Sequence, residues 1–88
     1  MFYTYCLQSK KEPRELYFGY TNDLKRRLVE HNKGLNISSA RYAPWELIYY
    51  EACLFESDAR RREAYLKTSV GRRMLKRRLL DHMRNVQS

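Results

Sequence analysis

Short runs of aromatic and β-branched residues alternate along the chain with stretches in which apolar residues recur at helical spacing. Polar clusters that contain glycine or proline separate them. Three of the runs predict β-strands: Phe2–Gln8 (FYTYCLQ), Leu16–Tyr20 (LYFGY) and Trp45–Cys53 (WELIYYEAC). The connection between the first two runs (SKKEPRE) is short and polar, so we expect these two strands to form a hairpin.

Between the second and the third strand, the pattern predicts one helix followed by a loop. The residues TND at 21–23 supply an N-cap, the helix ends near NKG, and Gly34 suits its C-cap. The next ten residues, LNISSARYAP, are expected to form a loop that Pro44 closes.

After the third strand, the pattern predicts two more helices. The first begins at Glu56, with Ser57 as its N-cap, and runs to about Thr68. The residues SVGRR then mark a break or kink, and a last basic helix covers Arg72–Met83. The order β-β-α-β-α-α predicts a single domain over residues 1–88, of the α+β class, with helices packed on a small three-stranded antiparallel sheet.

The first predicted helix carries an arginine and a histidine where apolar residues are expected. At about 100° per residue, with Leu24 at zero, Leu28 falls at about 40°, His31 at about −20° and Arg27 at about −60°. Because burying a polar or charged group is costly, Arg27 and His31 need a partner or a functional reason. The alternative is that Arg27 extends its charge into solvent and His31 is a hydrogen-bonded histidine at the edge of the core.

The next helix has a carboxylate within its apolar stripe. With Ala59 at zero, Leu66 lies at about −20°, Val70 at about 20° and Glu63 at about 40°. In a basic surround, this carboxylate could hold a divalent cation against a phosphate while waters complete the shell, as Mg²⁺ prefers. The alternative is a salt bridge to Lys67, which would contribute only a few tenths of a kcal/mol.

The predicted strands add tyrosines to these groups. Tyr3, Tyr5 and Leu7 share one face of the first strand by alternation. Tyr17 stands two residues before Gly19, whose missing side chain lets a backbone or a substrate approach closely. Packing accounts for most tyrosines in most proteins, but with an inward arginine, histidine and glutamate they could line one concave site for proton transfer, phosphate binding and metal binding.

The formal net charge is +8, and basic residues are concentrated late in the chain. Ten lysines and arginines stand from Arg60 to Arg84, against two acidic residues, Glu63 and Asp81. This bias favours a polyanion such as a nucleic-acid backbone, although a solvated helix surface is the alternative. The residues expected to contact nucleic acid are Arg72, Arg73, Lys76, Arg77 and Arg78.

The remaining composition indicates a folded protein of the cytoplasm. Hydrophobic residues make up 43% of the chain, which is typical of a globular domain. Cys6 and Cys53 lie in predicted strands without metal-ligand spacing, so we expect small buried thiols in a reducing compartment. The N-terminal residues do not form a signal peptide, and no run approaches the ~20 apolar residues of a membrane span.

The sequence resembles the GIY-YIG nuclease family, most closely its small stand-alone bacterial members. YTY at Tyr3–Tyr5 stands where the first motif of the family falls, and YFG at Tyr17–Gly19 stands where the second falls. Arg27, His31 and Glu63 follow in the order of the family. Two positions depart from the family pattern: the first motif lacks its glycine and isoleucine, and the residue after the second motif is a tyrosine where some relatives have a lysine.

The resemblance implies a role for each of these residues. Glu63 would bind the divalent metal, Mg²⁺ or Mn²⁺, and Arg27 would hold the scissile phosphate. His31 occupies a position where the family places a histidine or tyrosine near the leaving group. Tyr5 and Tyr17 are the paired motif tyrosines, one of which orients or deprotonates the attacking water, and the choice between them stays open.

These features together predict a metal-dependent endonuclease domain that hydrolyses phosphodiester bonds in nucleic acid, most simply DNA, in repair or processing. The alternatives are a non-catalytic nucleic-acid-binding module of the same fold and an adaptor that docks on a repair protein. A protein partner could supply substrate specificity, because the sequence shows no appended DNA-binding domain.

Overall fold

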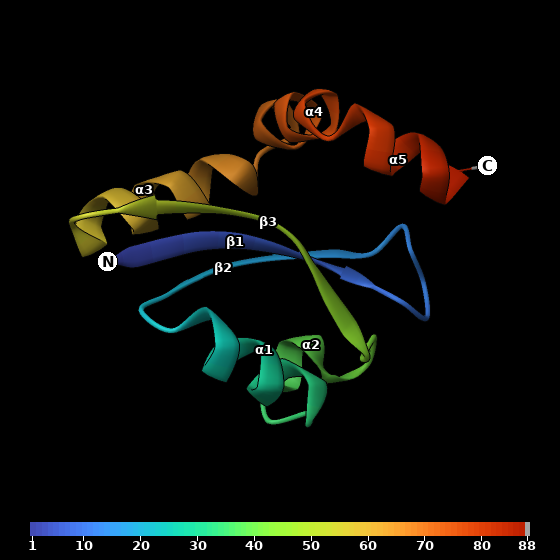
Figure 1. Cartoon of the computed structure of the whole chain (residues 1–88), viewed down its shortest axis with the longest axis horizontal. Helices are drawn as coiled ribbons and strands as arrows, with labels where there is room; N and C mark the ends of the chain where they lie inside the picture. The colour runs from blue at the N-terminus through green and yellow to red at the C-terminus, as the bar shows by residue number, and fades with distance from the viewer. Residues whose placement is uncertain (88) are drawn as a thin grey trace.

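A computed structural model describes residues 1–87 and places a three-stranded antiparallel sheet between two layers of helices (Figure 1). The strands lie in the order β2-β1-β3 and are β1 (Phe2–Ser9), β2 (Leu16–Thr21) and β3 (Trp45–Cys53). The helices are α1 (Leu24–Asn32), α2 (Ile37–Ala40), α3 (Glu56–Leu66), α4 (Ser69–Arg78) and α5 (Leu80–Gln87). The predicted α+β class, hairpin and antiparallel sheet are confirmed. Within residues 1–87, no helix has the length and apolar character needed to cross a membrane.

The central strand β1 is buried on both faces because helices cover the sheet on both sides. In Figure 1, α1 and α2 lie below the sheet, whereas α3, α4 and α5 lie above it. On the α1 side, Tyr5 and Leu7 pack with Trp45 in one core cluster. On the opposite side, Cys6 packs with Phe18 and with one leucine each from α3 and α4. Successive side chains of β1 therefore point alternately into two thin hydrophobic cores, one on each face of the sheet.

Buried hydroxyl groups of β1 attach the strand to its neighbours. Thr4, which stands at the isoleucine position of the first motif, donates a hydrogen bond from Oγ1 to the carbonyl oxygen of Ala59 in α3 at 2.7 Å. Ser9, at the other end of the strand, donates from Oγ to the carbonyl oxygen of Tyr42 at 2.6 Å. The bond from Thr4 fixes α3 against the sheet, and with it the position of Glu63 one turn after Ala59.

A short helix occupies part of the segment that the sequence predicts as a loop. α2 forms within residues 35–44, and the side chain of Asn36 caps it by accepting a hydrogen bond from the backbone N–H of Ser38 at 3.0 Å. The helix is only four residues long, so it shows no helical periodicity that the sequence could reveal. The predicted C-cap of α1 is close to the observed one, since Gly34 adopts a φ of 74° directly after the cap residue Lys33.

The predicted start of α3 at Glu56 is confirmed, but its predicted N-cap and its predicted end near Thr68 are each wrong by two residues. The N-cap residue is Phe55 rather than Ser57, and no side chain makes a capping hydrogen bond there. The helix ends at Leu66 because Thr68 caps the next helix, accepting a hydrogen bond from the backbone N–H of Gly71 at 3.0 Å.

The predicted basic helix over residues 72–83 is two helices. α4 begins earlier, at Ser69, and ends at Arg78, and α5 begins at Leu80 after a break at Leu79. Val70 therefore belongs to α4 rather than to the apolar stripe of α3, and it is about half exposed.

The expectation of buried thiols holds for one of the two cysteines. Cys6 is buried, and burial raises the pKa of its thiol to about 12. Cys53 is only partly buried, because it ends β3 at the edge of the sheet. Both cysteines are free.

Candidate active site

Tyr5 of β1 is paired with Gly19 of β2, and the ring of Tyr5 lies directly against this glycine. A Cβ atom at position 19 would lie 2.6 Å from Cζ of Tyr5, closer than real Cβ contacts come. Position 19 in the second motif is therefore a glycine because any side chain there would overlap the Tyr5 ring of the first motif. The space that it leaves allows the Tyr5 side chain to lie across β2 rather than stand upright from the sheet.

Two side chains of α1 converge on the hydroxyl of Tyr5. Nε2 of His31 lies 2.8 Å from Tyr5 Oη, and Nε of Arg27 donates a longer hydrogen bond to the same oxygen at 3.4 Å. Asp23 begins the helix by accepting a hydrogen bond from the backbone N–H of Arg26 at 3.0 Å. This cap sets the phase of α1, so that residues 27 and 31, one turn apart, face the same tyrosine.

His31 is fully buried, and its second ring nitrogen is bound by Ser39 of α2. Nδ1 of His31 lies 2.6 Å from Oγ of Ser39, and this hydroxyl also approaches the carbonyl oxygen of Asn36 at 3.4 Å. If the Ser39 hydroxyl donates to that carbonyl, it accepts from Nδ1–H, and Nε2 is left unprotonated to accept the hydrogen bond of the Tyr5 hydroxyl. Every polar atom of this chain of contacts then has a consistent donor or acceptor role.

The protonation states of the pair follow from their burial. Burial lowers the pKa of His31 to about 4, and the neighbouring charge of Arg27 acts in the same direction. Burial raises the pKa of Tyr5 to about 12, although the hydrogen bond and charge of Arg27 oppose the rise. At neutral pH both groups are therefore uncharged, with the shared proton on the tyrosine.

Tyr17 stands on the other side of the same histidine. The rings of Tyr17 and His31 meet edge to face with centroids 4.7 Å apart. The Tyr17 hydroxyl accepts hydrogen bonds at 3.4 Å from Nδ2 of Asn36 and from Oγ of Ser38. The two motif tyrosines thus flank His31, and α2 with its N-cap residue Asn36 holds both the histidine and the second tyrosine.

Three residues of α2 and its N-cap were not identified from the sequence. Asn36, Ser38 and Ser39 fall in the segment predicted as a loop, and polar residues are common in loops of any protein. The one available signal was the order Asn36-Ile37-Ser38, since asparagine is a strong N-cap residue.

Arg27 is also bound by an acidic neighbour. Its Nη1 lies 3.1 Å from Oε1 of Glu30, while Arg26 approaches the other oxygen of Glu30 at 3.8 Å. Burial by itself lowers the pKa of Arg27, but the hydrogen bonds to Tyr5 and Glu30 outweigh it and keep the guanidinium charged. Tyr5 and Glu30 together orient the guanidinium, and its other N–H groups remain available for a phosphate.

Glu63 approaches from the opposite helical layer. Its carboxylate pairs with Nζ of Lys67 at 3.3 Å, and its side chain is 20% exposed. Burial is the main cause of the raised pKa of Tyr5, and the negative charge of Glu63 adds a smaller effect in the same direction. Glu63 is therefore close enough to act on Tyr5 electrostatically. The predicted salt bridge to Lys67 is present, and it leaves the carboxylate at the surface, where a ligand can reach it.

A single carboxylate sets the kind of metal site that the chain can offer. Within residues 1–87, no group of three or more histidine, cysteine, aspartate or glutamate side chains could hold a metal ion. Mg²⁺ often binds through one or two carboxylates, with substrate phosphates and several waters completing its shell. Glu63 fits such a site, because it lies at the surface in a basic surround.

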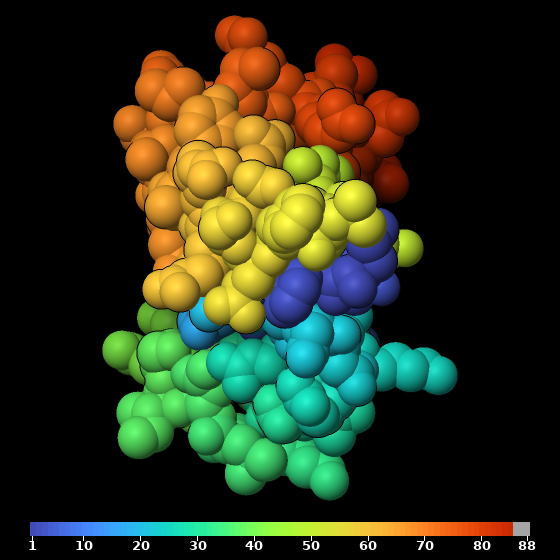
Figure 2. Space-filling view, turned by 90° about the vertical axis from the view of Figure 1, so that its left-hand side faces the viewer, coloured from blue at the N-terminus to red at the C-terminus, as the bar shows by residue number. Residues whose placement is uncertain are grey.

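The basic residues of α4 lie outside this cluster, in the layer above the sheet. Figure 2 shows this layer (yellow to orange) and the α1–α2 layer (teal to green) meeting at a waist where blue residues of the first strands reach the surface. Cζ of Arg72 lies 5.7 Å from the centroid of the Phe18 ring, so Arg72 packs against β2. All five predicted contact residues are exposed: Arg72, Arg73, Lys76, Arg77 and Arg78.

The fold and this cluster define a small α+β domain with paired tyrosines, an arginine and a histidine on the α1 face of the sheet and a glutamate from α3 in the opposite layer. A family model described as GIY-YIG catalytic domain matches residues 1–77. The chain belongs to the GIY-YIG family, whose members are in general endonucleases that use divalent metal ions.

Relatives in bacteria support the same assignment. The chain is 38% identical over 68 residues to "UPF0213 protein CPE1444" of Clostridium perfringens, a match that covers 76% of this chain and 71% of that protein. It is 41% identical over 66 residues to "UPF0213 protein SpyM50708" of Streptococcus pyogenes, covering 74% and 70%. No solved structure matches the chain at a significant level.

Proposed function

We propose that this protein is a metal-dependent endonuclease that hydrolyses phosphodiester bonds in nucleic acid, most simply DNA. The observation that carries the proposal is the convergence of His31 and Arg27 on the hydroxyl of Tyr5, at 2.8 and 3.4 Å. Nucleic-acid binding alone does not require a buried neutral histidine aimed at a tyrosine oxygen. A nuclease uses such a group to remove a proton from water.

Tyr5 is the tyrosine that the contacts favour for proton transfer. Its oxygen takes a proton from the attacking water as its own proton moves to Nε2 of His31, and the resulting hydroxide attacks the phosphorus. With pKa values of about 12 for Tyr5 and about 4 for His31, the proton rests on the tyrosine until attack develops. Both ring nitrogens of His31 are occupied, by Tyr5 and by Ser39, so we assign it to this relay rather than to contact with the leaving group.

Arg27, Tyr17 and Glu63 complete the proposed site. Arg27 binds the scissile phosphate through the N–H groups that Tyr5 and Glu30 leave unused, and so stabilises charge on the phosphoryl oxygens. Tyr17 holds the other flank of His31 and helps to position the water. Glu63 is the residue that would bind Mg²⁺ or Mn²⁺, and the ion, when bound, supplies a Lewis acid at a phosphoryl oxygen.

Affinity for the substrate backbone comes from the basic helices. The exposed cations of α4 supply positive potential in the layer that also carries Glu63, and phosphate contacts by lysine and arginine dominate nucleic-acid affinity. Processing or repair of DNA is the biological role that this activity would serve. A protein partner would select the site of cleavage.

Cleavage of labelled nucleic acid tests the proposal. Duplex, flap, junction and single-stranded DNA, with RNA of the same sequences, are incubated with the protein and Mg²⁺ or Mn²⁺, and EDTA serves as the control. We expect metal-dependent cuts in at least one DNA substrate and none in EDTA or with Tyr5→Phe. Binding without cleavage on all substrates would instead support a non-catalytic binding module of the same fold.

A further inference from the structure

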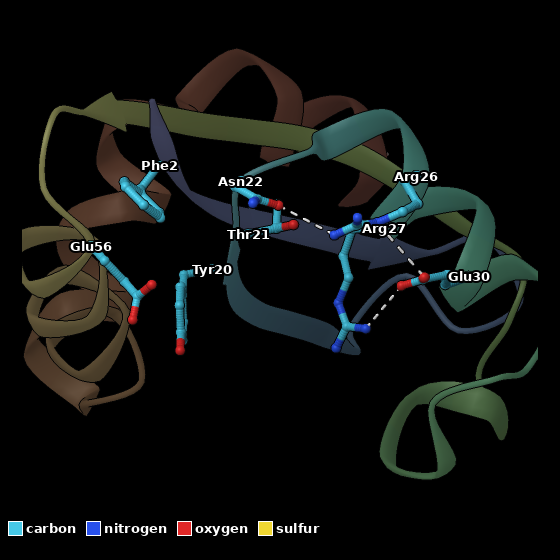
Figure 3. Close-up of a pocket in the computed structure, with 8 residues that line it drawn as sticks. All are labelled: Phe2, Tyr20, Thr21, Asn22, Arg26, Arg27, Glu30 and Glu56. Atoms are coloured by element: carbon cyan, nitrogen blue, oxygen red, sulfur yellow. Dashed lines mark hydrogen bonds and ion pairs between the residues drawn. The ribbon is translucent and has the colours of Figure 1, made fainter.

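A cleft adjoins the proposed catalytic cluster and is not used by it. The cleft has a volume of about 390 Å³ and lies where α1 and α3 begin, beside the end of β2 (Figure 3). The segments that border it face the viewer in Figure 2. Arg27 belongs both to the proposed catalytic cluster and to the lining of the cleft, so the cleft begins at the residue assigned to the scissile phosphate.

The two walls of the cleft have opposite character. The wall on the α1 side carries Arg26 and Arg27 together with Glu30, whose carboxylate pairs with both of them, so this wall has two cations and one anion. Figure 3 shows the Arg27 guanidinium directed into the open space. Phe2, Tyr20 and Glu56 form the wall on the α3 side, where the Tyr20 ring and the Glu56 carboxylate face the same space. A ligand with an anionic end and an aromatic end that carries hydrogen-bond donors would match this polarity.

Tyr20 is held in place for such a contact. It pairs with Thr4 across the β1–β2 ladder, so its side chain leaves the sheet on the α3 side rather than toward Tyr5. Cζ of Arg60 lies 5.7 Å from the centroid of its ring, which limits the rotation of the phenol. The ring is only partly buried and keeps a surface in the cleft.

We propose that this cleft binds the base of a nucleotide that neighbours the scissile phosphate in the same strand; the inference rests on the proposed nuclease function. The phosphate group lies against Arg26 and Arg27, the unpaired base stacks on Tyr20, and an amino group of the base donates a hydrogen bond to Glu56. The volume of the cleft is large enough for one nucleobase with its sugar.

The spacing along α3 agrees with this arrangement. Glu56 and Glu63 are seven residues apart in one helix, which places them on the same side of α3 and about 10 Å apart along its axis. The proposed metal ligand and the proposed base acceptor therefore follow each other along one side of α3. A strand that runs along α3 meets the metal site first and the base cleft next.

The cleft also predicts a base preference. A carboxylate only accepts hydrogen bonds, so Glu56 favours adenine, cytosine and guanine, which carry amino groups. Thymine presents two carbonyl oxygens beside its single N–H, and these oxygens repel a carboxylate. Replacing Glu56 by glutamine, which both donates and accepts, should remove this discrimination.

The experiment uses a single-stranded DNA that carries 2-aminopurine at successive positions, in EDTA for binding and in Mg²⁺ for cleavage. Stacking on Tyr20 should quench 2-aminopurine at one position beside the cut. Tyr20→Ala should abolish the quenching and weaken binding about 5- to 150-fold, whereas Tyr20→Phe should keep both. The matched control is Tyr50→Ala, which removes an exposed tyrosine of β3 that does not line the cleft. Glu56→Gln should equalise cleavage of strands with adenine or thymine at the quenched position.

The possible outcomes separate this inference from the proposed function. If wild-type protein cleaves DNA but Tyr20→Ala behaves like Tyr50→Ala in quenching and affinity, the base cleft is contradicted and the nuclease proposal stands. If quenching depends on Tyr20 but no substrate is cleaved, the cleft is supported and the catalytic proposal fails. A wild-type protein that neither binds nor cleaves any strand contradicts both.

Discussion

The hydroxyl of Tyr5 and Nε2 of His31 lie 2.8 Å apart, although the two residues are 26 positions apart in the chain. Tyr5 comes from the central strand and His31 from the last turn of α1, so the contact fixes this helix against the sheet. Both side chains are almost completely buried. The pair is therefore a structural contact as well as a proposed proton relay. Measurements of stability test the first role, and measurements of cleavage test the second.

The structural role predicts a pH dependence of stability. The pKa of His31 is lowered to about 4 in the folded protein from about 6.5 in the unfolded chain. Between pH 6.5 and pH 4, His31 takes up a proton in the unfolded chain but not in the folded protein. The stability that His31 contributes above pH 6.5 therefore decreases as the pH falls toward 4. Between pH 7 and pH 5, urea unfolding should show a decrease about 2 kcal/mol larger in wild type than in His31→Gln. Equal decreases in the two proteins would mean that His31 is protonated at little cost in the fold.

Gly19→Ala tests the contact between the two motifs. The added Cβ would overlap the phenol of Tyr5, so we expect a decrease of about 1–3 kcal/mol in stability and much slower cleavage as the hydroxyl moves. The control is Gly34→Ala, because Gly34 has a φ of 74° and only ordinary contacts nearby. That change should cost about 1 kcal/mol without affecting the cleavage rate at a temperature where the protein is folded. Unchanged cleavage in folded Gly19→Ala would show that the position of Tyr5 is not critical.

Neighbouring arginines of α1 should differ in their effect on cleavage. Arg27→Ala removes the group bound to Tyr5 and assigned to the phosphate, so cleavage should be abolished. Arg26→Ala removes a more exposed arginine that contacts Asn22 and Glu30, and it should lower activity by less than about tenfold. Initial rates under saturating metal measure both, and circular dichroism confirms folding. Reductions of similar size would refute the distinction between the two side chains.

Neutralisation of α4 should change the salt dependence of binding. The triple change Arg73→Gln, Lys76→Gln and Arg77→Gln should flatten the plot of log affinity against log salt by about 0.7–0.9 for each phosphate that is no longer bound. The double change Lys10→Gln and Lys11→Gln, in the β1–β2 turn, is a comparison for a general reduction of positive charge. Arg72 is left unchanged because it packs on Phe18 and its removal would also cost stability. A slope that depends only on total charge would place the phosphate-binding residues elsewhere.

The sequence predicted the strands and the inward residues around Tyr5 because both follow from simple periods. Alternation in β1 assigns Tyr5 to one face, and the helical period aligns Arg27 and His31 with the core stripe of α1. Ser39 could not be predicted, because α2 is a single turn and its contact with His31 depends on how the chain returns to β3. The helical period places Glu30 on the far side of α1 from the core stripe, but its side chain is long enough to reach Arg27 at 3.1 Å.

The break between α4 and α5 was missed for a similar reason. A run of basic residues with leucines at helical spacing continues through Leu79 and Leu80, so the local pattern gives no stop signal such as glycine or proline. In the structure α5 turns back toward the sheet, where Nε2 of His82 lies 2.6 Å from Oε1 of Gln8. Contacts between residues 74 positions apart are not visible in a local pattern.

The most direct test of the proposed nuclease is a comparison of Glu63→Gln with Lys67→Gln. Both changes break the same 3.3 Å ion pair, but only the first removes the carboxylate assigned to the metal. Each should cost only a few tenths of a kcal/mol in a thermal melt, because the pair is an i,i+4 contact near the surface. Cleavage in Mg²⁺ should fall by orders of magnitude in Glu63→Gln, with DNA binding retained, and stay close to wild type in Lys67→Gln. Full cleavage by folded Glu63→Gln would contradict the metal role and the catalytic assignment that depends on it.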